Sequence, residues 1–174
     1  ICSTCRYVLS YAAYRECCTS GKGTDMFLMI LRAKNEDERA IFELQKSIYE
    51  QDEDKFGISP LKQTLAEIHV DFQKCTVLKA IENDKIVGSV RAYLSNGSLH
   101  IEKLFVVPEK KGFGIEDELL RKIEKCFNVQ RYEVAVIKRD KADLKVYQQA
   151  GYKIYSAKDI SDDVMMIYLE KRSM

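Results

Sequence analysis

Apolar and polar residues alternate along the first third of the chain in patterns typical of one strand and two helices. The apolar run over residues 27–33 predicts a first strand. Asn35, followed by acidic residues, predicts a helix N-cap and a helix that runs to about Tyr49, because carboxylates in the first turn complement the helix dipole. Ser59 and Pro60 predict the start of a second helix, since proline is well tolerated at the first helical position.

The middle of the chain has the shorter period of extended structure. Apolar and β-branched residues fill the segments 76–81, 86–94 and 99–107. Residues typical of tight turns occupy 82–85 and 95–97, between these segments. The pattern therefore predicts three consecutive antiparallel strands.

The last third of the chain alternates between helical and extended patterns. An amphipathic helix is predicted over residues 114–127, a strand over 132–137, a helix over 141–150 and two final strands over 152–155 and 164–170. The whole order is β-α-α-β-β-β-α-β-α-β-β. It predicts a mixed α/β (α+β) domain with a central, mostly antiparallel sheet of about seven strands flanked by about four helices.

Composition and charge argue against several classes of protein. The 28 basic and 27 acidic residues leave a net charge of +1, which gives no overall attraction to nucleic acid or to an acidic membrane surface. The apolar runs fall short of the roughly 20 residues needed to span a bilayer. We therefore expect a cytoplasmic domain whose partners include neither nucleic acid nor membrane.

The first 25 residues differ from the rest of the chain. They show neither helical nor strand period and lack the pattern of a signal peptide, and Met26 directly precedes the first strand. We expect a domain over residues 26–174, preceded by an extension over residues 1–25 that is foreign to the natural protein or disordered. A less favoured alternative for the extension is a zinc site, because thiolates at C-x-x-C spacing chelate this metal. The site would use Cys2, Cys5, Cys17 and Cys18.

The most informative segment is residues 104–115, where a buried-type strand leads into a basic, glycine-containing turn and then a helix. The start of a helix presents unpaired N–H groups, and glycine lets the backbone approach an anion closely. Lys110 and Lys111 add positive charge beside Gly112 and Gly114. The segment predicts a phosphate site, and the alternative is an ordinary strand-to-helix turn with solvated lysines.

The same segment resembles the GNAT superfamily of acetyl-CoA-dependent N-acetyltransferases. The family's strand end, L-x-V-x-P, corresponds to Leu104, Val106 and Pro108, and its Q/R-x-x-G-x-G/A turn corresponds to residues 111–116. The likeness extends over about residues 26–172. A second motif, A-x-x-x-x-Y-x-x-x-G-F/Y, is similar to the stretch that contains Ala142, Leu144, Val146, Tyr147, Gly151 and Tyr152.

The resemblance implies where acetyl-CoA would bind. Main-chain groups of Phe105, Val106 and Val107 would pair with the pantetheine arm as an added strand does. Neither a metal nor a covalent enzyme intermediate is implied. The diphosphate would be surrounded by the turn residues Lys111, Gly112, Phe113, Gly114, Ile115 and Glu116.

Two of these positions depart from the family pattern. Lys111 stands where Gln or Arg is usual, and Glu116 stands where Gly or Ala is usual. A carboxylate near a diphosphate repels it, which predicts weakened CoA binding. A second hypothesis is therefore a catalytically degenerate GNAT domain that binds CoA or a protein partner.

The resemblance also implies roles in catalysis for two residues. Acyl transfer needs a neutral amine, and Glu102 is the candidate base, with Ile101 and Leu104 expected to desolvate it. Tyr147 stands where many members have the acid that protonates the departing CoA thiolate. The alternatives are a solvent-facing strand carboxylate for Glu102 and a packed aromatic ring for Tyr147.

The expected reaction is direct attack of a primary amine on the thioester in a ternary complex. The acceptor is a small-molecule or peptide amine whose identity the sequence leaves open. The acidic stretches 36–38 and 50–54 favour a cationic acceptor, with a solvated charged surface as the alternative. Dimers are common among members, so a homodimer is a further expectation. His69 and His100 are too isolated to predict a metal site.

Overall fold

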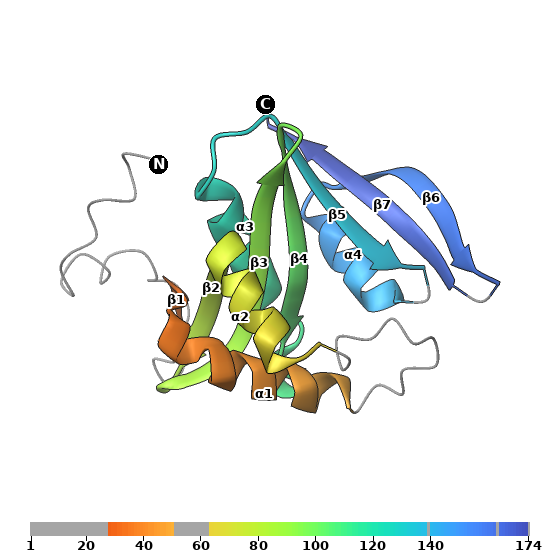
Figure 1. Cartoon of the computed structure of the whole chain (residues 1–174). Coiled ribbons are helices and arrows are strands. Elements are labelled where there is room, and N and C mark those ends of the chain that lie inside the picture. The colour runs from red at the N-terminus through yellow and green to blue at the C-terminus, as the bar shows by residue number, and fades with distance from the viewer. Residues whose placement is uncertain (1–27, 51–62, 139, 163, 174) are drawn as a thin grey trace.

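A seven-stranded sheet runs through the described part of the chain, and helices flank it (Figure 1). The computed structural model describes residues 28–50, 63–138, 140–162 and 164–173. The strands are β1 (Leu28–Arg32), β2 (Thr76–Glu82), β3 (Lys85–Ser95), β4 (Ser98–Val106), β5 (Arg131–Ile137), β6 (Lys153–Ser161) and β7 (Val164–Arg172). The helices are α1 (Glu38–Tyr49), α2 (Leu65–Lys74), α3 (Ile115–Lys125) and α4 (Lys141–Gln149), with 3₁₀ turns η2 (Asn35–Asp37) and η4 (Pro108–Lys110).

The strand order across the sheet is β1-β2-β3-β4-β5-β7-β6. Neighbouring strands are antiparallel except for β4 and β5, which are parallel. The hairpin turns follow from their sequences, because Asn83 and Asp84 and then Asn96 and Gly97 adopt the positive φ that tight hairpins require. The predicted fold class, a mostly antiparallel sheet with flanking helices, is confirmed.

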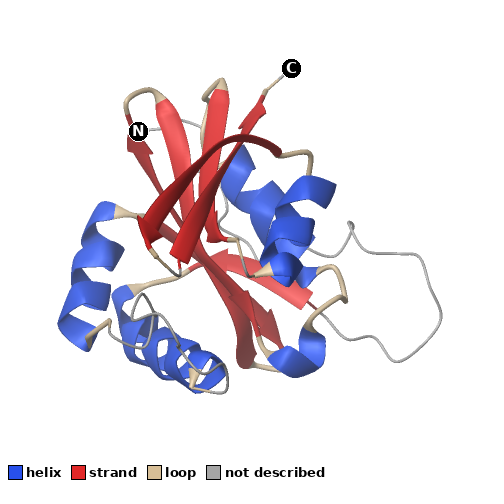
Figure 2. Cartoon of the chain, turned by 90° about the vertical axis from the view of Figure 1, so that its right-hand side faces the viewer, coloured by secondary structure: helices blue, strands red, loops and turns tan. Residues whose placement is uncertain are grey.

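Helices cover both faces of the sheet, with α1 and α2 on one side and α3 and α4 on the other (Figure 2). Ile41 and Ile48 of α1 form a smaller core with Phe105 of β4. A larger core fills the opposite side, where α3 packs its apolar stripe against the sheet because these residues recur at helical spacing. The stripe consists of Ile115, Leu119, Leu120 and Ile123.

Gly88 of β3 allows β4 and α3 to lie close together. A Cβ atom at this position would lie 2.8 Å from the Phe105 carbonyl oxygen and 3.0 Å from Val106 Cγ2. It would also lie 3.4 Å from Leu119 Cδ1 of α3. A larger side chain would therefore displace the strand and the helix that carry the predicted cofactor site.

The start of α1 differs from the sequence prediction. Asn35 does not cap α1, because it lies inside the 3₁₀ turn that precedes this helix. The predicted start of the second helix at residues 59–60 lies outside the described residues, and α2 as described begins at Leu65. Its N-cap is Thr64, whose hydroxyl oxygen accepts a hydrogen bond from the Glu67 N–H at 3.3 Å. The Thr-x-x-Glu pattern is a capping box and was present in the sequence.

Several expectations lie outside the described residues. They concern the extension over residues 1–25, its four cysteines and zinc alternative, and the acidic stretch from residue 51 to 54. The last hairpin is described, and β6 runs to Ser161, well beyond the predicted end at Tyr155. No helix in the described ranges is both long and apolar enough to cross a lipid bilayer.

Candidate functional site

The parallel strands β4 and β5 separate part-way along their length. Their pairing runs from Ser98 with Arg131 to Ile101 with Val134 and then stops. Strand β4 continues beyond that point, and Figure 1 shows the two strands diverging towards their carboxyl ends. Residues 102–106 therefore form an edge of β4 that does not pair with β5, which we call the free edge.

A β-bulge stands where the free edge begins. Ser89 pairs with Phe105 and Arg91 pairs with Glu102, so a single β3 residue faces two residues of β4. One of these two is Lys103, whose φ of 51° lies in the left-handed region. The bulge turns the strand away from its regular ladder at the point where β5 departs.

The bulge also reverses the alternation of side chains along β4. Leu99 and Ile101 face the larger core before the bulge, and Leu104 and Val106 face it afterwards. In a regular strand the next core position after Ile101 would be residue 103, because side chains alternate with a period of two. The bulge thus keeps Lys103 out of the core.

The main chain of the free edge is available at Val106. The Val107 N–H donates to the Val87 carbonyl oxygen at 2.8 Å, and the Phe105 carbonyl oxygen lies beside Gly88 of β3. Main-chain groups point to alternate sides along a strand, so those of Val106 point away from β3 and towards the separation from β5. Of the three residues predicted to pair with a pantetheine arm, the central one has this orientation.

Gly112 and Gly114 shape the turn between β4 and α3. Their φ values are 80° and 83°, and a Cβ atom at either position would meet nothing within 4 Å. Conformation, and not crowding, therefore explains these glycines. Gly114 is the N-cap of α3, and its carbonyl oxygen accepts from the Glu118 N–H at 3.1 Å. The N–H groups of the first helical turn, from Ile115 onward, have no intrahelical partner and can bind an anion.

The two lysines of this turn differ in their contacts. Lys110 forms an ion pair with the buried Glu82 carboxylate at 2.5 Å, and its Nζ lies 5.9 Å from the centroid of the Phe113 ring. Lys111 is exposed and interacts electrostatically with Asp143 of α4. Lys111 is therefore the lysine of the turn that is better placed to meet an anionic ligand.

Carboxylates of α3 and α4 lie within electrostatic range of each other and of Lys111 in the predicted diphosphate turn. Burial and then the Asp140 charge raise the pKa of Asp143 to about 6, with Glu116 adding to the rise and Lys111 opposing it. Asp140 caps α4, and its carboxylate accepts from the Asp143 N–H at 3.0 Å. The acidic departure at Glu116 is thus matched by a second acidic group across the turn.

Tyr147 is buried on the inner side of α4. Its ring meets that of Tyr152 edge-on, with centroids 5.7 Å apart. Burial, and then Asp143, raises the pKa of Tyr147 above its usual value, so the hydroxyl stays protonated and can donate a hydrogen bond. Tyr49 of α1 and Glu102 of β4 also contribute to this shift, which means that the Tyr147 hydroxyl lies within electrostatic range of both.

Glu102 is exposed at the start of the free edge. The Tyr93 hydroxyl donates a hydrogen bond to its carboxylate at 3.3 Å. Ile101 and Leu104 were expected to desolvate Glu102, and this expectation is wrong. Both belong to the larger core, on the opposite face of the sheet from Glu102.

A family model described as "Acetyltransferase (GNAT) domain" matches residues 44–173. This chain belongs to the GNAT acetyltransferase family. The matched part of the GNAT domain contains the free edge, the glycine turn and α4. Among curated protein sequences no significant match is found.

Solved structures share the fold of this GNAT domain at low sequence identity. PaiA N-acetyltransferase from Thermoplasma acidophilum, in complex with coenzyme A, is 16% identical with a TM-score of 0.71, over 85% of this chain and 100% of that one. The yncA protein of Salmonella typhimurium, with its cofactor acetyl-CoA, is 12% identical with a TM-score of 0.68, over 84% and 94% of the two chains. A GNAT-family acetyltransferase from Streptococcus pneumoniae is 17% identical with a TM-score of 0.67, over 84% and 99%.

Sequence reasoning missed a buried polar network in the GNAT domain. Arg91 of β3 is 1% exposed, and its guanidinium donates to Asp71 of α2, to Gln45 of α1 and, at 3.2 Å, to Gln63. The Gln63 amide in turn donates to Asp71 at 2.6 Å. The network connects α1 and α2 to β3 next to the bulge. A single arginine in an apolar strand gives no sign of whether it is buried or exposed, so the sequence carried no usable signal.

Within the described ranges, no group of three or more His, Cys, Asp or Glu side chains is arranged to hold a metal ion. His69 lies near the surface, with Nδ1 3.0 Å from a carboxylate oxygen of Glu38. His100 stacks on Tyr93 with ring centroids 5.2 Å apart. Because Tyr93 also contacts Glu102, His100 and Glu102 lie on the same face of the sheet.

Replacing Asp143 with Asn should stabilise the domain at pH 7.5. The raised pKa means that the folded state holds the Asp143 proton more tightly than the unfolded state, so ionisation at neutral pH destabilises the fold. This cost is relieved as the pH falls through about 6. Asn resembles the protonated acid, and we expect a gain of about 1–3 kcal/mol at pH 7.5 that shrinks steadily towards pH 4.

Thermal unfolding of both proteins between pH 7.5 and 4 measures this difference. Asp159→Asn, on the exposed strand β6, is the matched control and should leave the pH dependence unchanged. A gain in Tm that is equal at every pH, or a loss at neutral pH, would contradict the conclusion that the ionised Asp143 carboxylate destabilises the fold.

Proposed function

We propose that this chain is an N-acetyltransferase that transfers the acetyl group of acetyl-CoA to a primary amine by direct attack in a ternary complex. The observation that carries the proposal is the free edge of β4, where Val106 presents unshared main-chain groups next to the glycine turn at the start of α3. An extended pantetheine arm can pair with such an edge as an added strand. The unpaired N–H groups of α3 suit the diphosphate.

The direction of the arm follows from these two features. The diphosphate belongs at the turn, and the pairing of β4 with β5 closes the separation at Ile101. The thioester end therefore belongs near the bulge, beside Glu102 and Lys103. PaiA N-acetyltransferase in complex with coenzyme A and yncA with acetyl-CoA, which share the fold, support this choice of ligand.

Glu102 and Tyr147 are the groups best placed for the chemistry. The Glu102 carboxylate removes a proton from the acceptor ammonium, directly or through a water molecule, and the amine nitrogen then bonds to the acetyl carbon as the carbon–sulfur bond breaks. The Tyr147 hydroxyl donates a hydrogen bond to the departing sulfur. Because the pKa of Tyr147 is raised, its hydroxyl keeps its proton and transfers it to the sulfur less readily. The main contribution of Tyr147 is therefore to stabilise the thiolate by hydrogen bonding.

The second candidate function is a degenerate GNAT domain that binds CoA or a protein partner without turnover. It is favoured by the acidic groups at the diphosphate site, Glu116 and Asp143. Lys111 and the unpaired N–H groups of α3 oppose this repulsion. Binding without any acetyl transfer is the result that would distinguish this function from the enzyme.

The proposed acceptor is a small-molecule or peptide amine, and the proposed location is the cytoplasm. The balanced net charge supports neither nucleic acid nor membrane as a partner.

Replacing Tyr147 with Phe should lower kcat for amine acetylation by about 10- to 100-fold, because one donor to the developing thiolate is lost. The dissociation constant for acetyl-CoA should stay within about twofold, since the ring remains in place. Release of CoA thiol from a panel of primary amines measures the first quantity, and calorimetry measures the second.

Tyr152→Phe is the matched control for this variant. Its ring belongs to the same aromatic pair, and its hydroxyl is already held by Glu124 at 2.8 Å. This variant should retain kcat. An unchanged kcat in Tyr147→Phe would remove Tyr147 from the mechanism, and a matching fall in both variants would point to packing alone.

Replacing Glu116 with Gln should tighten the binding of acetyl-CoA about fivefold, because it removes a repulsion of about 1 kcal/mol between the carboxylate and the diphosphate. Isothermal titration calorimetry at low salt measures the change. Asp117→Asn, one residue further along the same helical turn and exposed, is the control and should have a smaller effect. Weaker binding in Glu116→Gln would show that the carboxylate assists the site.

A further inference from the structure

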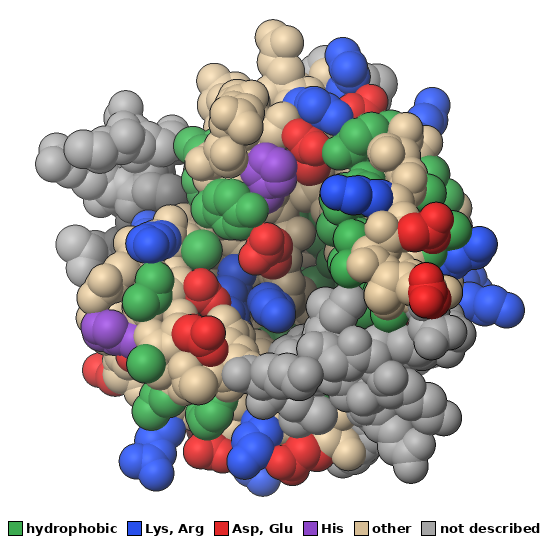
Figure 3. Space-filling model, turned by 45° about the vertical axis from the view of Figure 1, so that its right-hand side comes forward, with side chains coloured by type: hydrophobic (Ala, Val, Ile, Leu, Met, Phe, Trp, Pro, Cys, Tyr) green, Lys and Arg blue, Asp and Glu red, His purple; other side chains and the backbone are tan. Residues whose placement is uncertain are grey.

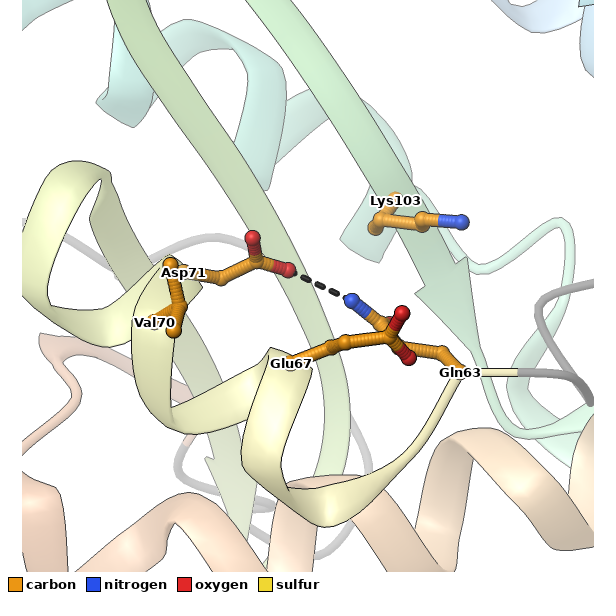
Figure 4. A pocket seen from close by; sticks show the side chains of 5 residues that line it. All are labelled: Gln63, Glu67, Val70, Asp71 and Lys103. Atoms are coloured by element: carbon orange, nitrogen blue, oxygen red, sulfur yellow. Dashed lines mark hydrogen bonds between the residues drawn. The ribbon is translucent and has the colours of Figure 1, made fainter.

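Lys103 lines a shallow pocket on the acceptor side of the sheet. The pocket encloses about 420 Å³ and lies between the bulge of β4 and the start of α2. Figure 4 shows Lys103 reaching out from β4, with its ammonium pointing away from Asp71. Its lining residues are Gln63, Glu67, Val70, Asp71 and Lys103.

The two carboxylates of this pocket are already engaged. Glu67 accepts hydrogen bonds from the Thr64 N–H at 2.7 Å and from the Thr64 hydroxyl at 3.0 Å. Asp71 forms an ion pair with Arg91 and accepts from the Gln63 amide. Both acids therefore serve the local fold, by capping α2 and by fastening it to β3.

The ammonium of Lys103 has no such contact. It forms neither a hydrogen bond nor an ion pair with any residue in the described ranges. Burial, and then the positive charge of Arg91, lowers the pKa of Lys103, while nearby carboxylates act on it only from a distance. A half-buried cation at a strained bulge position, without a direct counterion, can accept an anionic group of a ligand.

The residue next to Lys103 carries the opposite charge. Glu102 is exposed, and among the described residues its carboxylate accepts a hydrogen bond from the Tyr93 hydroxyl alone. Glu102 and Lys103 form no ion pair with each other, although they are adjacent in the chain. The start of the free edge therefore presents one carboxylate and one ammonium within electrostatic range of each other, and neither has an ion-pair partner among the described residues. Figure 3 shows acidic and basic side chains intermixed on the face of the molecule that this view presents.

We propose that the Lys103 pocket binds the carboxylate of the acceptor, so that the acceptor is a free amino acid whose ammonium meets Glu102. This inference rests on the proposed function, because it identifies the amine that the acetyltransferase uses. An amino-acid zwitterion carries its positive and its negative group on the same carbon atom, and Glu102 and Lys103 offer one charge of each opposite sign. A polyamine would instead bring a second ammonium towards the ammonium of Lys103, which repels it.

The chemical step leaves the carboxylate untouched. The acceptor ammonium loses one proton to Glu102, and its nitrogen bonds to the acetyl carbon while the carbon–sulfur bond breaks and its electron pair leaves with the CoA sulfur. A second proton passes from the nitrogen to that sulfur through water, which gives the amide and the CoA thiol. Lys103 takes no part in this exchange. It is a positioning residue that holds the acceptor, and its loss should raise KM more than it lowers kcat.

The experiment compares three matched sets of acceptors on the full chain with acetyl-CoA. These are the common L-amino acids, their α-amides, and the decarboxylated amines with the same side chains, together with spermidine. We expect amino acids to exceed their amides and amines in kcat/KM by about tenfold or more, the size of a charge-assisted hydrogen bond. Product mass identifies the acetylated nitrogen.

Variants of Lys103 assign the preference to this residue. Lys103→Gln should raise the KM for the best amino acid about tenfold or more and leave its amide nearly unaffected, whereas Lys103→Arg should retain the preference. Lys74→Gln, an exposed lysine at the end of α2, is the control and should behave as the unaltered chain.

Three results would overturn the inference. One is a preference for amides, amines or spermidine over amino acids, and another is an equal loss for all acceptors in Lys103→Gln. The third is acetyl-CoA binding with no amino acid acetylated at all. Absence of acetyl-CoA binding by calorimetry would instead contradict the proposed function, so the two failures are distinguishable.

Discussion

The end of the pairing between β4 and β5 is the constraint on which the site depends. Parallel strands normally continue their ladder, and here the ladder stops at Ile101 and Val134. The bulge at Lys103 stands next to this point and sets which side chains of β4 face the core. Gly88 supports the same arrangement from β3, since it lets β4 and α3 approach closely. An unpaired strand edge inside a sheet is costly unless something completes it, and that is the physical case for an extended ligand.

The electrostatics of the site combine attraction and repulsion. In the proposed cofactor site, the N-terminus of α3 and Lys111 would attract a diphosphate, whereas Glu116 and Asp143 would repel it. Burial and then the Asp140 charge raise the pKa of Asp143, and Glu116 adds a smaller contribution, so Glu116 and Asp143 repel each other even without a ligand. Weak cofactor binding and catalysis are compatible, because only interactions that strengthen in the transition state accelerate the reaction.

Most of the fold could be predicted from the sequence because its signals are local. Apolar periodicity located the strands and helices, and turn residues such as Gly97 marked the hairpins. The capping box of Thr64 and Glu67 marks the start of α2 at Leu65, and the sequence prediction did not use this signal. The bulge also left a signal in the sequence, because the apolar positions shift from Leu99 and Ile101 to Leu104 and Val106. A prediction that assigns each strand as a whole does not detect this change of alternation.

The site was harder to predict because it depends on contacts between distant segments. The Arg91 network joins α1, α2 and β3, and no local pattern distinguishes a buried arginine from an exposed one. The exposure of Glu102 depends on which face of the sheet it occupies, and the approach of Asp143 to Glu116 depends on how α4 packs. Resemblance supplied the residues of the cofactor site, and the structure supplied their orientation.

The most direct measurement of the central claim is amide hydrogen exchange at the free edge, with and without saturating acetyl-CoA. Binding along β4 should slow exchange of the Val106 amide by about tenfold or more, because a ligand acceptor completes its hydrogen bond. The Val107 amide, already bonded to the Val87 carbonyl, should change little. Saturation with acetyl-CoA that leaves Val106 exchange unchanged would contradict the account.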